Sequence, residues 1–158
     1  MQGERVEELQ QYTRRNCLLV TGIPESTGEN TDELIQNLAR DKMKFELKEY
    51  DIDRTHRTGQ SYNGKPRAIA VKFTRYTTRN NFMKNRKQLK GTRIGVQEML
   101  TPYTRGLLKR AQDLVEQAHW VKGAWTWDGK VNILVQPLGC KKPKRETVKN
   151  QADLYSIF

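Results

Sequence analysis

Acidic residues are absent from one long stretch of this chain. Residues 54–93 contain no aspartate and no glutamate, but they hold twelve lysines and arginines. The formal net charge of the whole chain is +11, so this segment carries the entire excess and the remainder is close to neutral. Such a localised block of positive charge is typical of a protein that meets a polyanion. The alternative is a solvated surface whose charges only repel one another.

Cysteine and long apolar runs are also scarce. The two cysteines, Cys17 and Cys140, are far apart in sequence and have no CxxC spacing. This argues against a disulfide framework or a zinc site and favours a reducing compartment. No apolar run approaches the roughly 18 residues that would span a membrane, and no signal peptide is recognisable. We therefore expect no membrane partner, no metal and no cofactor.

Sequence patterns that carry catalysis are missing as well. The chain has no G-x-S-x-G elbow, no P-loop and no HExxH motif. His56 and His119 lack a paired cysteine-nucleophile pattern, and Asp51 and Asp53 lack the third carboxylate that a metal nuclease would need. We interpret these two acids as surface or strand-start residues and predict that the protein is not an enzyme.

Residues 16–99 are predicted to form the main domain. Its apolar pattern predicts, in order, a strand over 17–24, a helix over 28–45, strands over 51–59 and 66–73, a helix over 77–91 and a strand over 92–99. Asn30 and Glu33 form a capping-box signature at the start of the first helix. This order is the split βαβ arrangement of the ferredoxin-like class, an α+β sandwich of the RNA-recognition type with one open sheet face.

The N-terminal segment, residues 1–15, is charged and helix-prone. Val6, Leu9 and Tyr12 form a thin apolar stripe along it, as in the end of a longer helix or coiled coil. Two heptads are too few to establish a coiled coil, and a frayed helix is the alternative.

Residues 100–158 predict a small C-terminal domain built from a helix and a hairpin. Thr101 can cap the helix, and Pro102 fits its first position. A β-hairpin is predicted to turn at Asp128–Gly129. Residues 141–147 are expected to be a polar linker, and residues 148–158 a short helix or strand.

The hairpin allows two registers. A two-residue loop pairs Trp127 with Lys130 and leaves both indoles on a polar face. A three-residue loop buries Trp125 beside Ile133 and exposes Trp127 at the turn. We favour the second register, because it buries one tryptophan. Trp127 then offers either a stacking surface for bases or a turn aromatic that packs on its neighbours.

The third predicted strand carries an incomplete RNA-recognition octamer. Ala68 and Ala70 stand where two aromatic rings would stack on bases, and Leu19 stands where the first strand would supply another. Each missing ring forgoes roughly 1–3 kcal/mol per base. Affinity should therefore come mostly from lysine and arginine contacts to phosphates, with strong salt dependence and little sequence specificity.

Strand alternation indicates which cations face the open side of the sheet. With Val71 inward, Lys72 lies on the open face. With Ile52 inward, Arg57 is expected on the same open face. Arg54 would share the parity of Ile52 unless a bulge intervenes, so its direction stays open.

Six stretches of the chain, in this order, resemble one protein family: LQQYTRRNCLLVTGIPES, RTHRTG, KPRAIAVKF, QLKG, LTPYTRGLLKRA and WTWDGK. They are similar to the nucleic-acid-binding protein encoded by the first open reading frame of LINE-type non-LTR retrotransposons, and the baculovirus few-polyhedra protein shares the pattern. The resemblance runs from about Leu9 to about Val135. It implies an upstream coiled coil, a non-standard RNA-recognition domain and a C-terminal domain that together grip single-stranded nucleic acid.

The resemblance also implies a biological setting. It implies a homotrimer through the coiled coil, coating of the element's own RNA in a cytoplasmic or nuclear ribonucleoprotein, and strand-annealing chaperone activity in transposition. The binding residues that it carries over are Arg14, Arg15, Arg54, Arg57, Arg67 and Arg105.

Residues and resemblance together give the expected nucleic-acid-binding set: Arg14, Arg15, Arg54, Arg57, Lys65, Arg67, Lys72, Arg75, Arg79, Arg105 and Trp127. Replacing Arg57 and Arg67 together is expected to weaken binding at least about tenfold without lowering thermal stability. Lys84, Arg86, Lys87 and Lys90 are equally well explained as a solvated helix surface. The alternative function is a structural or protein-interaction module of the few-polyhedra type that does not bind nucleic acid.

Overall fold

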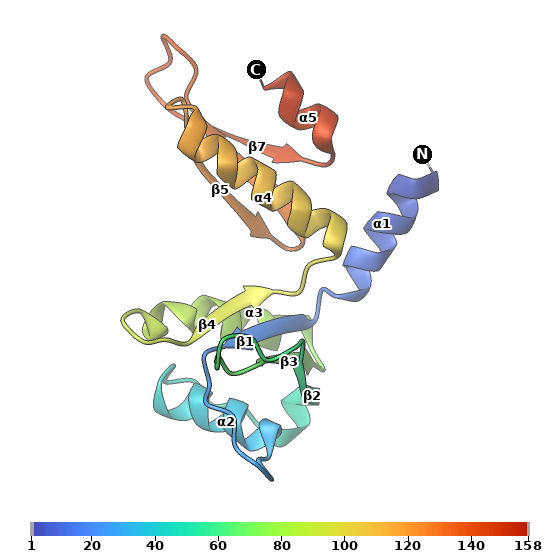
Figure 1. The fold of residues 1–158 in the computed structure, drawn as a ribbon, viewed down its shortest axis with the longest axis vertical. Coiled ribbons are helices and arrows are strands. Elements are labelled where there is room, and N and C mark those ends of the chain that lie inside the picture. The colour runs from blue at the N-terminus through green and yellow to red at the C-terminus, as the bar shows by residue number, and fades with distance from the viewer. Residues whose placement is uncertain (1, 158) are drawn as a thin grey trace. The chain divides into compact units, whose positions relative to one another are not determined.

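A computed structural model describes residues 2–157 of the chain, which form an α+β protein (Figure 1). Within these residues lie five α-helices and two antiparallel sheets, one of four strands and one of three. The chain divides into two compact units. Arg15–Met99 forms one unit, and the first helix, α1 (Gln2–Thr13), joins the residues from Leu100 onward in the other.

The Arg15–Met99 unit has the predicted order of strands and helices. Its elements are β1 (Cys17–Thr21), α2 (Thr31–Asp41), the 3₁₀ turn η1 (Glu49–Asp51), β2 (Ile52–Thr58), β3 (Ala68–Phe73), α3 (Tyr76–Lys84), the 3₁₀ turn η2 (Asn85–Leu89) and β4 (Gly95–Glu98). The strands lie in the order β2-β3-β1-β4, and each is antiparallel to its neighbours. This order leaves β2 and β4 as the two edges of the sheet.

One face of this sheet packs against both helices. Asn30 caps α2 as predicted, because its side chain accepts a hydrogen bond of 3.3 Å from the backbone N–H of Glu33. Ile35 from α2 and Phe82 from α3 are fully buried against the sheet, and the rings of Phe82 and Phe73 lie 5.3 Å apart. The opposite face of the sheet is therefore the one that neither helix of this unit covers.

The second unit contains a three-stranded sheet with helices on one side. Its elements after α1 are α4 (Pro102–Gln117), β5 (Val121–Trp127), β6 (Lys130–Val135), β7 (Lys144–Val148) and α5 (Gln151–Ser156), and the sheet order is β5-β6-β7. Thr101 caps α4 by accepting from Thr104 N at 3.1 Å, as predicted. Leu107 and Ala111 of α4 and Leu154 of α5 share one core with the sheet.

The prediction of a polar linker over residues 141–147 is wrong in part. Lys144–Val148 is strand β7, which pairs with β6 along its whole length. Val148 is the one buried residue of these five. An edge strand with so little burial shows no apolar alternation, so its sequence pattern predicts a linker and not a strand.

Helix α1 exposes its apolar stripe. The side chains of Val6, Leu9 and Tyr12 are 53%, 63% and 60% exposed, and no residue of Gln2–Thr13 is buried. Glu7 and Gln11, on another face of α1, accept hydrogen bonds from Thr101 at the start of α4. Across residues 2–157, no helix combines the length and the apolar character needed to cross a membrane.

Candidate nucleic-acid interface

A β-bulge in β2 decides which cations reach the uncovered face of the four-stranded sheet. The pairing register of β2 with β3 shifts between Ile52 and Arg54, and Asp53 is skipped. Arg54 therefore lies directly opposite Lys72, on the uncovered face, and both side chains are exposed. Arg57 lies on the opposite, helix-covered face. The prediction that Arg57 shares a face with Lys72 is wrong, because the bulge inverts the alternation after it.

Arg57 has a structural role. Its side chain is 5% exposed, and it forms a salt bridge with Glu29 through Nε at 2.7 Å and Nη2 at 3.0 Å. The remaining donors go to the backbone carbonyls of Ile23, Pro24 and Arg67 at 2.7–2.9 Å. These contacts use all five N–H groups of the guanidinium. Arg57 therefore has no donor left for a phosphate, and we expect its replacement to lower thermal stability.

The ion pair of Glu29 with Arg57 makes the free energy of unfolding depend on pH. The side-chain hydrogen bond from Arg57, followed by one from the backbone N–H of Ser26, holds the pKa of Glu29 below its ordinary value. A carboxyl whose pKa is lowered by folding stabilises the protein above its unfolded pKa, about 4.3 for glutamate. That stabilisation is lost as the pH falls through the folded pKa.

We predict that acid unfolds the wild-type protein more steeply than the Glu29→Gln variant. The variant lacks the titrating group, so part of the stability lost between pH 5 and lower pH is already missing at neutral pH. Urea unfolding at a series of pH values measures the difference. Parallel pH profiles for the two proteins would show that the Arg57–Glu29 pair contributes no pH-dependent stability.

Arg67 is also paired, but it is more accessible. Its Nε donates to Glu25 at 2.9 Å, and its side chain remains 38% exposed. The pKa of Glu25 lies below its ordinary value, chiefly because of this side-chain hydrogen bond. A phosphate would have to compete with the Glu25 carboxylate for this guanidinium. Arg67 is therefore a weaker candidate than the sequence alone indicates.

Arg79 does not belong to an exposed interface. Its side chain is 1% exposed on α3, and Nη2 donates to Glu98 of β4 at 2.8 Å. The guanidinium carbon also lies 5.7 Å from the ring centroid of Tyr76. The prediction that Arg79 binds nucleic acid is wrong, because the α3 turn that carries it faces the sheet.

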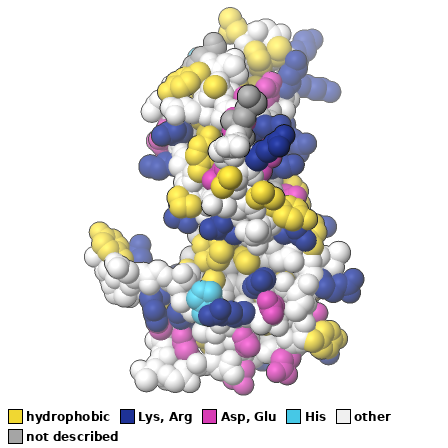
Figure 2. Space-filling model, turned by 90° about the vertical axis from the view of Figure 1, so that its right-hand side faces the viewer, with side chains coloured by type: hydrophobic (Ala, Val, Ile, Leu, Met, Phe, Trp, Pro, Cys, Tyr) yellow, Lys and Arg dark blue, Asp and Glu magenta, His cyan; other side chains and the backbone are white. Residues whose placement is uncertain are grey.

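The missing acids of residues 54–93 are thus supplied from elsewhere in the chain. Glu25, Glu29, Asp53 and Glu98 pair with Arg67, Arg57, Lys72 and Arg79, respectively. The Lys72–Asp53 pair is long, at 3.6 Å, and half exposed, so it constrains Lys72 little. On the face drawn in the space-filling view, Asp and Glu side chains also lie among the Lys and Arg side chains (Figure 2).

Cations lie at both ends of the uncovered sheet face. Arg54 and Lys72 meet near the end of β3, and the chain places Arg15 and Arg75 within a few residues of that end. Lys65 is exposed before the start of β3, beside Tyr62 in a turn with left-handed Asn63 and Gly64. The two groups are separated by the length of β3, about 17 Å at roughly 3.4 Å per residue. His56 is exposed between them, opposite Ala70.

Two predicted cations belong to the other unit. Arg14, at the end of α1, donates to the Gln10 carbonyl at 2.8 Å. Arg105, on the first turns of α4, donates to the Leu100 carbonyl at 3.5 Å, and its side chain is exposed. The structure therefore groups neither of them with Arg54 and Lys72 within one unit.

The hairpin of the three-stranded sheet adopts the register that we did not favour. Trp127 pairs with Lys130 and Trp125 with Asn132, around a two-residue turn. Asp128 (φ 54°) and Gly129 (φ 72°) are both left-handed, as a type I′ turn requires. The prediction of a three-residue loop is wrong, because the turn that matches the strand twist outweighs burial of one indole.

Trp125 and Trp127 therefore lie on the same, outward face of the sheet. They are 36% and 43% exposed, and the Trp125 ring packs against Gly123. Asn132 is buried and bonded to Thr147 at 3.1 Å, which fixes the sheet next to Trp125. The opposite face carries the buried residues that pack with α4.

Two cations share the outward face with the indoles. Lys130 lies opposite Trp127, and Arg145 lies opposite Leu134 on the same face. Both are exposed.

Trp125 is a candidate that the sequence prediction missed, although its spacing of two from Trp127 before Asp-Gly indicated a shared face. Indoles with neighbouring cations are suited to stack on bases and contact phosphates.

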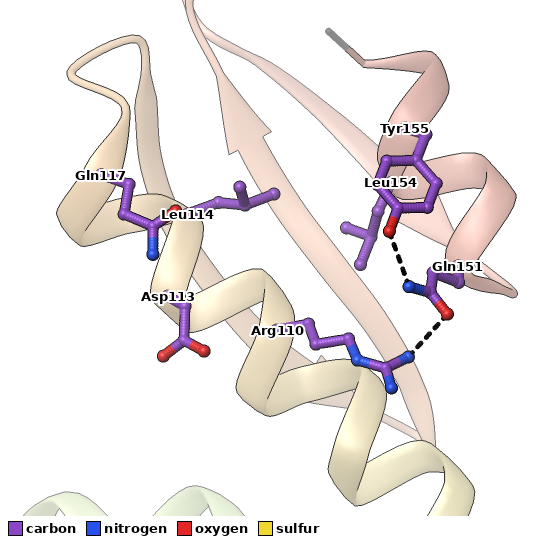
Figure 3. A pocket seen from close by; sticks show the side chains of 7 residues that line it. All are labelled: Arg110, Asp113, Leu114, Gln117, Gln151, Leu154 and Tyr155. Atoms are coloured by element: carbon purple, nitrogen blue, oxygen red, sulfur yellow. Dashed lines mark hydrogen bonds between the residues drawn. The ribbon is translucent and has the colours of Figure 1, made fainter.

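A small cavity of about 200 Å³ lies between α4 and α5 (Figure 3). Gln151 accepts from Arg110 at 2.9 Å and donates to the Tyr155 hydroxyl at 2.8 Å across it. Asp113 is the carboxylate that lines the cavity. The side chains that line the cavity mainly hold α5 against α4. No group of three His, Cys, Asp or Glu side chains between residues 2 and 157 is placed to hold a metal ion.

The two uncovered sheet faces are thus the surfaces from which a function can be inferred. The face of the four-stranded sheet carries two cations, Arg54 and Lys72, opposite each other. The face of the three-stranded sheet carries two indoles with cations beside them. Comparison with models of protein families and with curated proteins found no match to this chain.

Proposed function

We propose that the chain is a non-enzymatic protein that binds single-stranded nucleic acid, with RNA as its target, and acts as a nucleic-acid chaperone. The observation that carries this proposal is the pair of exposed indoles, Trp125 and Trp127, beside Lys130 on an uncovered sheet face. Indoles stack on any base, and such stacking contributes roughly 1–3 kcal/mol per base. The four-stranded sheet has Leu19, Ala68 and Ala70 where such rings would stand.

Phosphate contacts come from the uncovered face of the four-stranded sheet. Arg54 and Lys72 lie side by side there and are exposed; among residues 2–157, the carboxylate within salt-bridge distance of Lys72 is that of Asp53. The strand order β2-β3-β1-β4 supports a ferredoxin-like sandwich of the RNA-recognition type for this unit. The resemblance to the LINE-encoded protein agrees with this assignment and adds the chaperone role.

Low sequence specificity follows from the chemistry of these groups. Guanidinium and ammonium contacts to phosphates carry no base information, and an indole stacks on every base. The affinity of such binding falls steeply as the salt concentration rises, and bound strands exchange readily. Exchange between strands is what a chaperone that anneals nucleic acid requires.

We predict that replacing Arg54 and Lys72 together with alanine weakens RNA binding about tenfold. Both side chains are exposed, so thermal stability should stay at the wild-type level. The log–log salt slope should become shallower by about 1.4, since each phosphate contact to a single strand contributes about 0.7. Fluorescence titrations over a range of salt concentrations measure both changes.

The matched control removes Arg40 and Lys48, which are exposed and paired with Asp41 and Glu46. It loses the same charge from α2 and from the segment between α2 and η1, so it should retain the wild-type slope. Equal effects of the two double variants would mean that only net charge matters and that the uncovered face is not the interface.

Assembly is the second candidate function, and α1 favours it. Val6 and Leu9 are more than half exposed on a helix with no buried residue in Gln2–Thr13. Pairing with another helix would cover such a stripe, as in the homotrimer that the resemblance implies. Sedimentation of the Val6→Ser, Leu9→Ser variant tests this role. Loss of an oligomer without loss of RNA binding would separate the two functions.

A further inference from the structure

Five cations of the basic segment lie away from the interface described above: Lys84, Arg86, Lys87, Lys90 and Arg93. All five are exposed. Arg86, Lys87 and Lys90 line an open groove of about 430 Å³ between η2 and β4, whose apolar floor includes Leu89 and Val96. Among the residues that the structure describes, none of the five lies within salt-bridge distance of a carboxylate. They differ in this respect from Arg57, Arg67 and Arg79.

The backbone around the groove is well fixed. Thr92 donates to the Leu89 carbonyl through its N–H at 2.9 Å and its hydroxyl, and Gly91 (φ 88°) makes the turn between them. Like charges held close together on an ordered turn repel one another, and an anion between them removes that repulsion. The groove therefore has the preorganisation that a merely solvated helix surface lacks.

The groove is electrostatically separate from Arg54 and Lys72. The groove lies at the β4 edge of the sheet, whereas Arg54 lies on β2 at the opposite edge. Three strand spacings of roughly 4.8 Å place these edges about 14 Å apart. That distance exceeds the Debye length of about 8 Å at physiological ionic strength. An anion bound at one site is thus largely screened from the other.

We infer that this groove is a second phosphate-binding site. It takes the backbone of a second nucleic-acid strand while the uncovered face of the four-stranded sheet holds the first. This inference rests on the proposed function and extends it. One chain that holds two strands brings them together, which is the physical requirement for annealing. An acidic peptide fits less well, because Arg86 donates to the Val96 carbonyl at 3.4 Å and so occupies the free edge that an added strand would need.

The test uses the full chain and a short single-stranded RNA that can cover only one site. In saturation titrations at physiological ionic strength, the wild-type protein should bind two such oligonucleotides per chain. The Lys87→Ala, Lys90→Ala variant should bind one, and its log–log salt slope with a longer RNA should be shallower by about 1.4. Stoichiometry per chain does not depend on oligomeric state. Circular dichroism and thermal unfolding should match the wild type.

The matched control is Arg40→Ala, Lys48→Ala, which removes the same charge and should retain two oligonucleotides per chain. An unchanged stoichiometry in the groove variant would overturn the inference. Complete loss of short-RNA binding in that variant would also overturn it, because the groove would then be the first site. A groove that binds an acidic peptide but no RNA would identify a protein partner instead. Absence of any RNA binding by the wild type would refute the proposed function itself.

Discussion

Replacing Trp125 and Trp127 together with alanine should weaken binding of single-stranded RNA by about 30-fold or more. Each indole is expected to stack on a base, and loss of one stack costs roughly 1–3 kcal/mol. Two losses of at least about 1 kcal/mol each correspond to that change in the dissociation constant. Both rings are more than one-third exposed, so the sheet beneath them should stay folded. Fluorescence anisotropy with a labelled RNA measures the effect.

Two further variants make this prediction specific to stacking. The Trp125→Phe, Trp127→Phe variant keeps both rings and should retain most of the affinity. Tyr50→Ala removes an aromatic side chain that is 75% exposed in the other unit, and it should bind as the wild type does. If the alanine and phenylalanine variants bind equally well, the indoles do not stack on bases and the central observation loses its meaning.

Removing Arg79 should produce the largest loss of stability of any single arginine. Arg79 and Glu98 are 1% and 3% exposed, and removal of one partner leaves the other charge buried. Such a change typically costs about 3–5 kcal/mol. A unit the size of Arg15–Met99 has a total stability of about 4–13 kcal/mol at 0.05–0.15 kcal/mol per residue. Arg79→Met should therefore remove a large share of the free energy of unfolding of this unit, as measured by urea denaturation.

The double variant Arg79→Met, Glu98→Met distinguishes the buried pair from simple loss of packing. Removing both charges avoids the uncompensated carboxylate, so much of the lost stability should return. Arg79→Met protein that remains folded should bind RNA as tightly as the wild type, because the buried Arg79 side chain is not part of the proposed interface. Equal instability of the single and double variants would show that the ion pair is not the cause.

Apart from β7, the order of strands and helices could be predicted from the sequence because each apolar pattern lies within one element. Asn30 and Thr101 cap their helices as their sequence neighbours indicate. The direction of Arg57 could not be predicted, because the bulge after Ile52 is set by pairing with β3 and not by local pattern. One inserted residue is enough to move every later side chain of β2 to the other face.

The charge pattern predicted a cationic surface, but it could not predict where the cations are neutralised. Arg57 and Arg67 meet Glu29 and Glu25, which lie about 30 and 40 residues earlier in the chain. Pairs of this kind form only when the fold brings distant segments together. A count of charges in one segment therefore overstates the charge that a ligand meets.

The hairpin illustrates a conflict between two rules that the sequence could not resolve. Burial favoured a register with Trp125 inside, and turn geometry favoured the two-residue Asp128–Gly129 loop. The structure has the two-residue loop, in which Asp128 adopts the left-handed conformation that this turn requires. As a result, Trp125 is 36% exposed and does not contribute to the core.

The most direct test of the central claim is binding of single-stranded and double-stranded oligonucleotides by the full chain across a range of salt concentrations. We predict tighter binding of the single strand, because indoles can stack only on unpaired bases. We also predict a log–log slope of about −3 to −6, which corresponds to roughly 4–8 phosphate contacts. A flat salt response, or equal affinity for the duplex, would contradict the account.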